Sequence, residues 1–417
     1  MPVRGNAVYA QSGGVTSVIN ASAYGVIKAA MEAEFIDDIY AGSYGINGVL
    51  EDRLIDVYQE SFEAIEGLRY TPSAAFGSCR KKLGSIEKNR EEFERIIEVF
   101  KAHKIRYFFY NGGNDSMDTA YKISLVSKEM GYEVISIGVP KTVDNDLPIT
   151  DNTPGYGSVA KYNAIAIREG SFDVESMHRD STKVFVLESM GRHAGWIVGA
   201  TGLAATSEKD GPQIILFPER SFNQDEFLAK VEETVGKIGY CVVAVSEGVR
   251  RPDGTFIADS GLVDSFGHAQ LGGAGMTVAD IVKVNLKLKV HTAILDYCQR
   301  SGRHIASKTD VEQAIACGKK AVELAEEDKN GFMPVIFRES NDPYEWSIGE
   351  APISAIANQE KEVPDAFITM DGYHITDKFR EYATPLIAGE DYPPYKNGLP
   401  NYVRLKKVII PAKTKQS

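Results

Sequence analysis

The chain has 417 residues, of which 43% are hydrophobic and 25% are charged, a composition typical of globular proteins. This length exceeds what one ordinary core accommodates, so we expect two domains. The formal net charge of −12 argues against nucleic acid as the main partner, because phosphate backbones are bound by basic surface. A small phosphorylated ligand stays compatible with this charge, because it needs only a local cluster of Arg and Lys.

The N-terminus lacks the apolar stretch of a secretory signal, and no window approaches the eighteen apolar residues of a membrane span. The four cysteines are far apart and form no CxxC pair, so we expect reduced thiols in a cytoplasmic protein. They are Cys79, Cys241, Cys298 and Cys317.

The recurring unit along the chain is a short apolar strand followed by a polar loop and a helix. Such continuous apolar runs are typical of parallel strands that are buried on both faces. Their alternation with helices predicts a doubly wound α/β architecture. The expected strands are 8–10, 106–110, 134–139, 183–187, 213–217 and 241–245, and the expected helices include 18–31, 116–130 and 312–326.

The strand-ending loops fall into two blocks, which predicts two doubly wound, Rossmann-like lobes with the active site in the cleft between them. We expect residues 1–150, with part of about 275–330, to form the first lobe. Residues 151–275, with the C-terminal helices, form the expected second lobe. Residues 340–417 are a C-terminal extension to which the sequence assigns no role.

Residues 151–162 are the expected crossover between the lobes, because Gly and Pro punctuate them. Within them, residues 155–160 match GxGxxA but follow a polar loop, which predicts a turn into a helix and not a dinucleotide site. From about residue 277 onward we expect helices. The chain has no GxxxxGK[ST] motif, and its seven histidines have no zinc-binding spacing.

Two polar loops follow consecutive predicted strands, namely residues 112–116 and 140–146. Open α/β sheets place their chemistry at such strand ends, so these loops are expected to bring carboxylates to one crevice. Asp144, near Lys141, is a candidate acceptor for the proton of an attacking hydroxyl. In isolation, an Asp-Asn-Asp run is more often a turn or a helix cap.

The arrangement of these two loops fits phosphoryl transfer. This reaction also requires groups that hold phosphates and a cation. Gly13 and Gly14 would let backbone N–H groups approach phosphate oxygens at a helix N-terminus, although such a pair is often only a tight turn. Asn114 and Asp115 offer oxygens near a Mg²⁺ that the phosphates would mainly hold. The candidate forks for phosphate oxygens are Arg80, Arg192 and Arg300.

In their order along the chain, these motifs resemble the phosphofructokinase family, over about residues 3–320. The Thr-x-Asp-Asn-Asp and Met-Gly-Arg elements are the most specific. The matching segments are 12–14, 77–80, 112–116, 140–146, 188–195, 246–248 and 295–302.

The resemblance implies a phosphofructokinase-like fold in which the first lobe binds the phosphoryl donor and the second lobe binds the sugar phosphate. It also implies a role for each matching residue. Asp144 would accept the proton of the 1-hydroxyl of fructose 6-phosphate, and Lys183 would reach a neighbouring subunit's sugar phosphate in a homodimer or homotetramer. The implied donor-binding residues are Gly13, Gly14, Arg80, Asp115 and Lys141. The implied substrate-binding residues are Thr142, Val143, Asp144, Lys183, Met190, Gly191, Arg192, Glu247, Tyr297 and Arg300.

Two positions resemble the pyrophosphate-dependent branch, because ATP-dependent members usually carry glycine where this chain has Asp115 and Lys141. A carboxylate at 115 would repel the α-phosphate of ATP, and an ammonium at 141 would neutralise a short donor that brings no nucleoside. The implied activity is reversible, Mg²⁺-dependent phosphoryl transfer in glycolysis and gluconeogenesis. It converts pyrophosphate and fructose 6-phosphate into phosphate and fructose 1,6-bisphosphate, with Lys141, Asp115 and Asp144 at its centre.

The chain departs from the family pattern at two positions. Asn114 replaces a Mg²⁺-associated aspartate, for which Asp115 or Asp146 would compensate. His291 stands where a second basic sugar-phosphate residue is often arginine, and that role would pass to Lys289 or Arg303. The alternatives are an ATP-dependent kinase of the same fold and a non-catalytic regulatory subunit. Sedoheptulose 7-phosphate stays open as an acceptor, as do the effectors.

Overall fold

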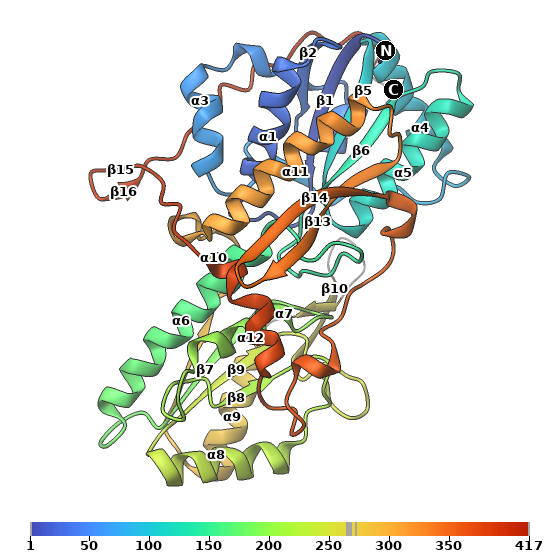
Figure 1. The fold of residues 1–417 in the computed structure, drawn as a ribbon. Helices are drawn as coiled ribbons and strands as arrows, with labels where there is room; N and C mark the ends of the chain where they lie inside the picture. Colours follow the sequence, from blue (N-terminus) through green and yellow to red (C-terminus); the bar gives the residue numbers. More distant parts are fainter. Residues whose placement is uncertain (1, 264–268, 272, 416–417) are drawn as a thin grey trace.

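Two mainly parallel sheets organise the chain, one in each of two lobes that are stacked along the length of the molecule (Figure 1). The computed structural model describes residues 2–263, 269–271 and 273–415. Figure 1 places both chain termini at the far end of the larger lobe. The predicted pair of doubly wound α/β lobes is confirmed.

The sheet of the larger lobe has the strand order β14-β13-β6-β5-β1-β2-β3, with β4 paired to β1. Strands β1, β2, β5, β6 and β13 run parallel, whereas β3 and β14 are antiparallel to their neighbours. The bounds are β1 Gly5–Ser12, β2 Ile36–Gly42, β3 Leu54–Asp56, β4 Ser78–Cys79, β5 Ile105–Gly112, β6 Ile135–Pro140, β13 Phe332–Asn341 and β14 Tyr344–Pro352.

The strands of the larger lobe are apolar on both faces because helices cover both faces. Tyr107 and Phe109 of β5 pack toward α1 and α11, and Phe108 and Tyr110 pack toward α4 and α5. This two-sided burial is why the sequence shows continuous apolar runs here. The bounds are α1 Ile19–Glu32, α2 Ile46–Leu50, α3 Phe62–Gly67, α4 Arg90–Ala102, α5 Asn114–Glu129 and α11 Lys308–Glu326.

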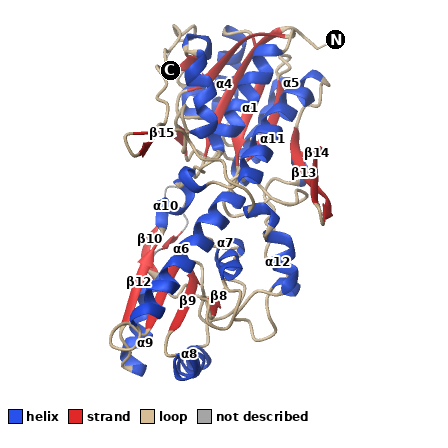
Figure 2. Ribbon diagram, turned by 60° about the vertical axis from the view of Figure 1, so that its left-hand side comes forward, coloured by secondary structure: helices blue, strands red, loops and turns tan. Residues whose placement is uncertain are grey.

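The sheet of the smaller lobe is fully parallel, in the order β12-β7-β9-β8. Helices α6 and α7 cover one face, and α8 and α9 cover the other (Figure 2). The bounds are α6 Tyr156–Met177, β7 Val184–Ser189, α7 Trp196–Ala200, β8 Ile214–Leu216, α8 Gln224–Ile238, β9 Cys241–Ser246, β10 Asp259–Val263, β11 Ala269–Leu271, α9 Ala274–Leu286, β12 Val290–Ile294 and α10 Asp296–Ser301.

Helix α6 begins in the segment predicted as the crossover, so the predicted turn into a helix is confirmed. Asp310 of α11 caps this helix, because its carboxylate accepts hydrogen bonds from Gly155 N at 2.8 Å and Ser158 N at 2.9 Å. A carboxylate at a helix N-terminus accepts hydrogen bonds from the free N–H groups, and its charge interacts favourably with the positive end of the helix dipole. The contact joins α6 to a helix of the larger lobe.

The prediction of helices from residue 277 onward is wrong for β12 and for the β13–β14 hairpin. The hairpin extends the larger sheet, and its apolar side chains, such as Met333 and Val335, join the core of that lobe. Short apolar runs of this kind do not distinguish a strand from a buried helix segment.

Residues beyond 340 return to both lobes. Helix α12 (Asp377–Ala383) packs beside α7 in the smaller lobe through Phe379, and Val403 packs against the larger lobe (Figure 2). The small hairpin is β15 Tyr395–Lys396 and β16 Leu399–Pro400.

All four cysteines are free, three of them are buried, and Cys298 is exposed on α10. Among the described residues, no helix has the length and apolar character that a membrane crossing requires.

Candidate active site

The donor side of the predicted site is built by the turn that follows β1. Gly13 N donates to Cys79 O at 2.9 Å, which draws the turn against the segment that carries Arg80. A Cβ atom at Gly13 would lie 3.2 Å from Lys141 Nζ. At Gly14 it would lie 3.2 Å from Arg300 Nη1 and 3.8 Å from an Arg80 Nη atom. Three cationic side chains therefore face the backbone of this turn.

The loops after β5 and β6 lie side by side, as the sequence predicts. Gly112 is opposite Pro140 in the register of these parallel strands, and Lys141 N donates to Gly112 O at 3.1 Å. Thr142 Oγ1 accepts a hydrogen bond from Asp144 N at 3.1 Å. Strand register therefore brings the 112–116 and 140–146 loops to one edge of the sheet.

Asp144 has a partly buried carboxyl group in a charged environment. Burial raises its pKa to about 7, and the carboxylates of Asp146 and Glu247 add to this effect. The positive charges of Lys141 and Arg192 oppose it. A carboxyl group with a pKa near neutrality is suited to proton transfer in the physiological range.

Lys141 is the most enclosed cation of the site, with 4% of its surface exposed. Burial lowers its pKa to about 8, and the neighbouring Arg300 and Arg80 act in the same direction. Asp144 and Asp146 act in the opposite direction. Because the cations here repel one another, a bound anion would relieve an unfavourable arrangement.

The sugar side of the predicted site comes from the loops after β7 and β9. Glu247 Oε1 accepts a hydrogen bond from Gly191 N at 3.3 Å, and Ser246 Oγ donates to Gly191 O at 2.6 Å. A Cβ atom at Gly248 would lie 2.0 Å from Arg192 O, so the two loops touch only because this residue is glycine. Burial raises the pKa of Glu247, which also faces Arg192.

Helix α10 closes this side of the site. The Arg300 guanidinium lies 4.0 Å from the ring centre of Tyr297, whose side chain is largely exposed. Gln299 is buried and accepts a hydrogen bond from Met190 N at 3.3 Å. Val143, from the opposite loop, and Met190 are partly buried, and both pack against the core of the smaller lobe.

Asp115 stands in the first turn of α5, and its carboxylate forms an ion pair with Lys82 at 2.6 Å. Both side chains are partly exposed, at 37% for Asp115 and 50% for Lys82. The pair holds the Asp115 carboxylate beside the helix N-terminus, which favours negative charge. Sequence reasoning missed Lys82, although it lies two residues after Arg80.

Two oxygens in the site fit a hard cation. Asn114 Oδ1 and Asp146 Oδ1 are buried, and neither has a hydrogen-bond partner within the described part of the chain. Carboxylate and amide oxygens are ligands that Mg²⁺ accepts. The described residues contain no cluster of three or more acidic, His or Cys side chains that could hold a metal. Phosphate oxygens of a ligand would have to complete the coordination shell.

The remaining basic candidates lie elsewhere. Lys183 precedes β7, at the strand end opposite the Met190 loop, and its amine donates to Arg179 O at 3.5 Å. Lys289 Nζ donates to Ser181 Oγ at 2.9 Å at the same end of the sheet, near exposed His291. Arg303 is fully buried and bonds to Arg69 O and Asp391. The suggestion that Arg303 binds the sugar phosphate is therefore wrong, because its fork is enclosed in a structural network.

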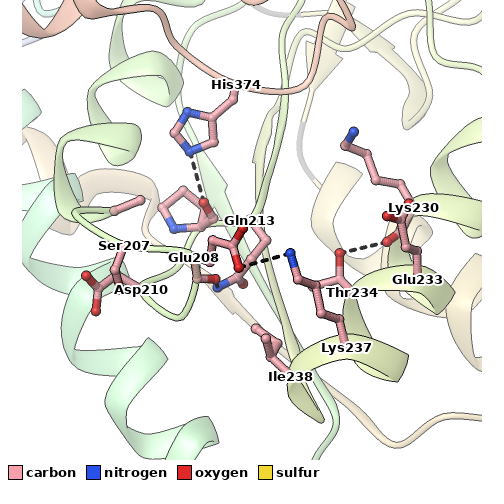
Figure 3. Close-up of a pocket in the computed structure, with 12 residues that line it drawn as sticks. Ser207, Glu208, Asp210, Gln213, Lys230, Glu233, Thr234, Lys237, Ile238 and His374 are labelled. Atoms are coloured by element: carbon pink, nitrogen blue, oxygen red, sulfur yellow. Dashed lines mark hydrogen bonds and ion pairs between the residues drawn. The ribbon is translucent and has the colours of Figure 1, made fainter.

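A pocket of about 350 Å³ lies elsewhere in the smaller lobe, between α8 and the segment before β8 (Figure 3). Its two lysines are already paired, Lys237 with Glu208 at 2.9 Å and Lys230 with Asp371 at 2.6 Å. Its described lining contains none of the site residues predicted from the sequence.

Comparison with known proteins finds a matching family and similar proteins. The chain matches the family described as phosphofructokinase over residues 6–325. A pyrophosphate–fructose 6-phosphate 1-phosphotransferase from Halomonas elongata is 58% identical over 403 residues, covering 96% of both chains. The protein of the same name from Methylococcus capsulatus is 56% identical over 409 residues, covering 98% of this chain and 97% of the relative.

A solved structure is similar along the whole chain. The crystal structure of a pyrophosphate-dependent phosphofructokinase from Nitrosospira multiformis superposes with a TM-score of 0.91 at 58% sequence identity. The match covers 99% of each chain, so both lobes and the C-terminal residues have counterparts in it.

Proposed function

The chain belongs to the phosphofructokinase family, and we propose that its site transfers a phosphoryl group from pyrophosphate to the 1-hydroxyl of fructose 6-phosphate. It is a pyrophosphate-dependent phosphofructokinase, as are the relatives that match it along nearly their whole length. The observation that carries the site assignment is the enclosed Lys141 amine, which faces the Gly13 backbone and lies in the field of Asp144.

The proposed reaction is an in-line displacement. The 1-hydroxyl oxygen forms a bond to one phosphorus of pyrophosphate, the bridging P–O bond breaks, and phosphate leaves. Asp144 accepts the hydroxyl proton, and its raised pKa suits this role because the carboxylate is a stronger base than an exposed one. In the reverse direction Asp144 returns the proton to the sugar oxygen.

We assign this side of the site to the phosphoryl donor on the basis of its charge and not of its shape. Lys141, Arg80 and Arg300 face the turn at Gly13 and Gly14, where the absence of Cβ atoms leaves room for phosphate oxygens. A planar guanidinium fork can donate parallel hydrogen bonds to two oxygens of one phosphate, and Lys141 acts as a point charge. These residues would neutralise the charge that moves onto the leaving phosphate.

Asp115 discriminates between donors in this proposal. Its carboxylate is fixed at the mouth of the donor side by Lys82, at 2.6 Å. A nucleoside triphosphate would have to place a further phosphate near this carboxylate, whereas pyrophosphate ends before it.

Mg²⁺ is the cofactor that we assign to this site. Asn114 Oδ1 and Asp146 Oδ1, both buried and without hydrogen-bond partners among the described residues, are the protein oxygens that would hold it. When bound, Mg²⁺ would neutralise phosphate charge and orient the donor. The weaker amide ligand at Asn114 agrees with a cation that arrives mainly as the Mg–pyrophosphate complex.

The acceptor is assigned to the loops of the smaller lobe. Met190, Gly191 and Glu247 would hold the sugar, while Arg192 and Arg300 would balance the negative charges of both substrates. Thr142 positions the loop through its bond to Asp144 N.

Lys183 completes the site only across a subunit boundary. It lies with Lys289 and His291 at an edge of the smaller sheet, where β12 has no partner strand on its outer side among the described residues. We propose a homodimer or homotetramer in which this basic edge reaches the sugar phosphate of a neighbouring subunit. We also propose that the protein is cytoplasmic, as expected from the sequence.

The test is product formation from fructose 6-phosphate and Mg²⁺ with pyrophosphate or ATP in parallel. Fructose 1,6-bisphosphate is expected with pyrophosphate alone. Product with ATP alone would overturn the donor assignment, and product with neither would indicate a non-catalytic subunit or another acceptor. A parallel reaction with sedoheptulose 7-phosphate defines the acceptor range.

A further inference from the structure

Asn145 lies between Asp144 and Asp146 in the 140–146 loop, and both ends of its side-chain amide are hydrogen-bonded. It is fully buried, and its φ of 56° lies in the left-handed region. Its Oδ1 accepts a hydrogen bond from Thr153 N at 3.1 Å, and its Nδ2 donates to the Tyr382 hydroxyl at 2.8 Å. Asn145, the neighbour of Asp144, is therefore held by a residue that lies 237 positions further along the chain.

Tyr382 is the second-to-last residue of α12, and its hydroxyl has a full set of partners. It accepts from Asn145 and donates to Asp151 O at 2.7 Å. Burial raises its pKa far above the usual range, so the hydroxyl keeps its proton and its donor role. The ring packs against Trp196 with ring centres 5.2 Å apart and against Phe367 at 5.6 Å.

Lys361 holds the same loop at a second point. Its backbone N donates to Asp146 O at 2.8 Å, and its amine donates to Thr150 O at 3.1 Å and Asp151 O at 2.9 Å. Its carbonyl accepts from Trp196 Nε1 at 2.9 Å. Trp196 begins the helix that follows the Met190–Arg192 turn. One segment therefore contacts the loop that carries the base and the element that follows the acceptor turn.

We propose that residues 361–382, which we name the C-terminal strap, position Asp144 relative to the acceptor, with Tyr382 acting through Asn145. This inference rests on the proposed function of the site. Tyr382 and Lys361 are positioning residues, because their contacts are with the loop and not with the reacting atoms. The strap gives a role to part of the chain that the sequence left without one.

The test compares Tyr382→Phe with Tyr240→Phe in steady-state kinetics with pyrophosphate. The Tyr240 hydroxyl also donates to a backbone carbonyl, Lys209 O at 2.6 Å, but at the far end of the smaller lobe. Because misplacing a reacting group by about 1 Å costs about a hundredfold in rate, we expect Tyr382→Phe to lower kcat ten- to a hundredfold. KM for both substrates is expected to stay within about threefold of wild type, and Tyr240→Phe to keep normal kcat.

A double mutant separates positioning from general loss of stability. If Tyr382 acts through Asn145, Asn145→Ala combined with Tyr382→Phe should be no slower than the slower single variant. Multiplicative losses would overturn the proposal, as would wild-type kcat in Tyr382→Phe. Melting temperatures identify any variant that does not fold. In that case Lys361→Met, which removes the amine contacts with Thr150 O and Asp151 O, is expected to show the same kcat loss at normal KM, and normal kcat would overturn the proposal.

Asp144→Asn is measured in the same assay, so that failure of the strap proposal can be distinguished from failure of the proposed function on which it rests. Normal turnover in Asp144→Asn would refute the base itself. Loss of turnover in Asp144→Asn together with normal turnover in Tyr382→Phe would refute only the strap.

Discussion

Ionisation of Lys141 is expected to limit capture of pyrophosphate at alkaline pH. Burial lowers the pKa of its amine to about 8, and Arg300 and Arg80 reinforce the shift. A lysine with a lowered pKa carries its charge below that pH and loses it as the pH rises through about 8. The donor side therefore loses its most enclosed positive charge within a range in which an exposed lysine stays protonated.

The size of the effect follows from this pKa. Lys141 is about nine-tenths protonated at pH 7, about half at pH 8 and about one-tenth at pH 9. Because kcat/KM reports ionisations of the free enzyme, loss of the Lys141 charge should lower kcat/KM for pyrophosphate about tenfold between pH 7 and pH 9. Deprotonation of Asp144, whose pKa is about 7, should raise kcat/KM about twofold over the same range. Bound pyrophosphate stabilises the ammonium, so kcat, which reports the complex, should fall less over the same range.

The assay is the pH profile of kcat/KM for wild type and Lys141→Arg at fixed excess Mg²⁺. Arginine keeps its charge throughout, so the alkaline fall should disappear from the variant even where its maximal rate is lower. Ionisation of the substrates is common to both proteins and cancels in the ratio of the profiles. Lys361→Arg is a matched control, because burial lowers the pKa of Lys361 to about 8 as well.

Three results would refute this reasoning. The first is a ratio of the wild-type kcat/KM profile to the Lys141→Arg profile that is flat between pH 7 and pH 9. The second is an unchanged alkaline fall in Lys141→Arg. The third is loss of the fall in Lys361→Arg, which would assign the ionisation to the strap and not to the donor side.

The other predictions concern single roles within the site. Asp144→Asn should lower kcat by about 10²- to 10⁴-fold with little change in KM, and near-normal turnover would remove Asp144 as the base. Asp115→Gly should raise kcat/KM for ATP, and an unchanged preference for pyrophosphate would contradict the repulsion argument. Asn114→Ala should raise the Mg²⁺ concentration required for half-maximal activity, and an unchanged titration would remove this ligand. In Gly14→Ala the new Cβ would lie 3.2 Å from Arg300 Nη1, so KM for pyrophosphate should rise while the melting temperature holds.

The central parallel strands of both sheets were predictable because two-sided burial leaves a direct mark on the sequence, whereas the parallel strands β2 and β12 were not predicted. Residues 106–110 and 241–245 are apolar at nearly every position, and both lie in central strands. The β13–β14 hairpin left a weaker mark, because its exposed end carries alternating polar residues such as Arg338. Nothing in this local pattern indicates that the hairpin joins a sheet whose other strands lie far away in the sequence.

The two loops of the donor side were predictable for a related reason. Strand register alone brings Gly112 opposite Pro140, so their following residues must share one edge of the sheet. The contacts that fix those loops were not predictable. Tyr382 reaches Asn145 only because α12 returns to the smaller lobe, and a tyrosine in an amphipathic helix is ordinarily a packing residue.

The nature of the donor explains why so much of the chain braces one loop. An enzyme can use binding energy from remote parts of a substrate to orient the reacting groups. Pyrophosphate has no such remote part, so the protein itself must supply the alignment between Asp144 and the phosphoryl group. In this chain the alignment is supplied by backbone register, by Asn145 and by the strap with Lys361 and Tyr382. On this view, weakening the strap slows the chemical step and leaves the charge-based capture of the donor by Lys141 intact.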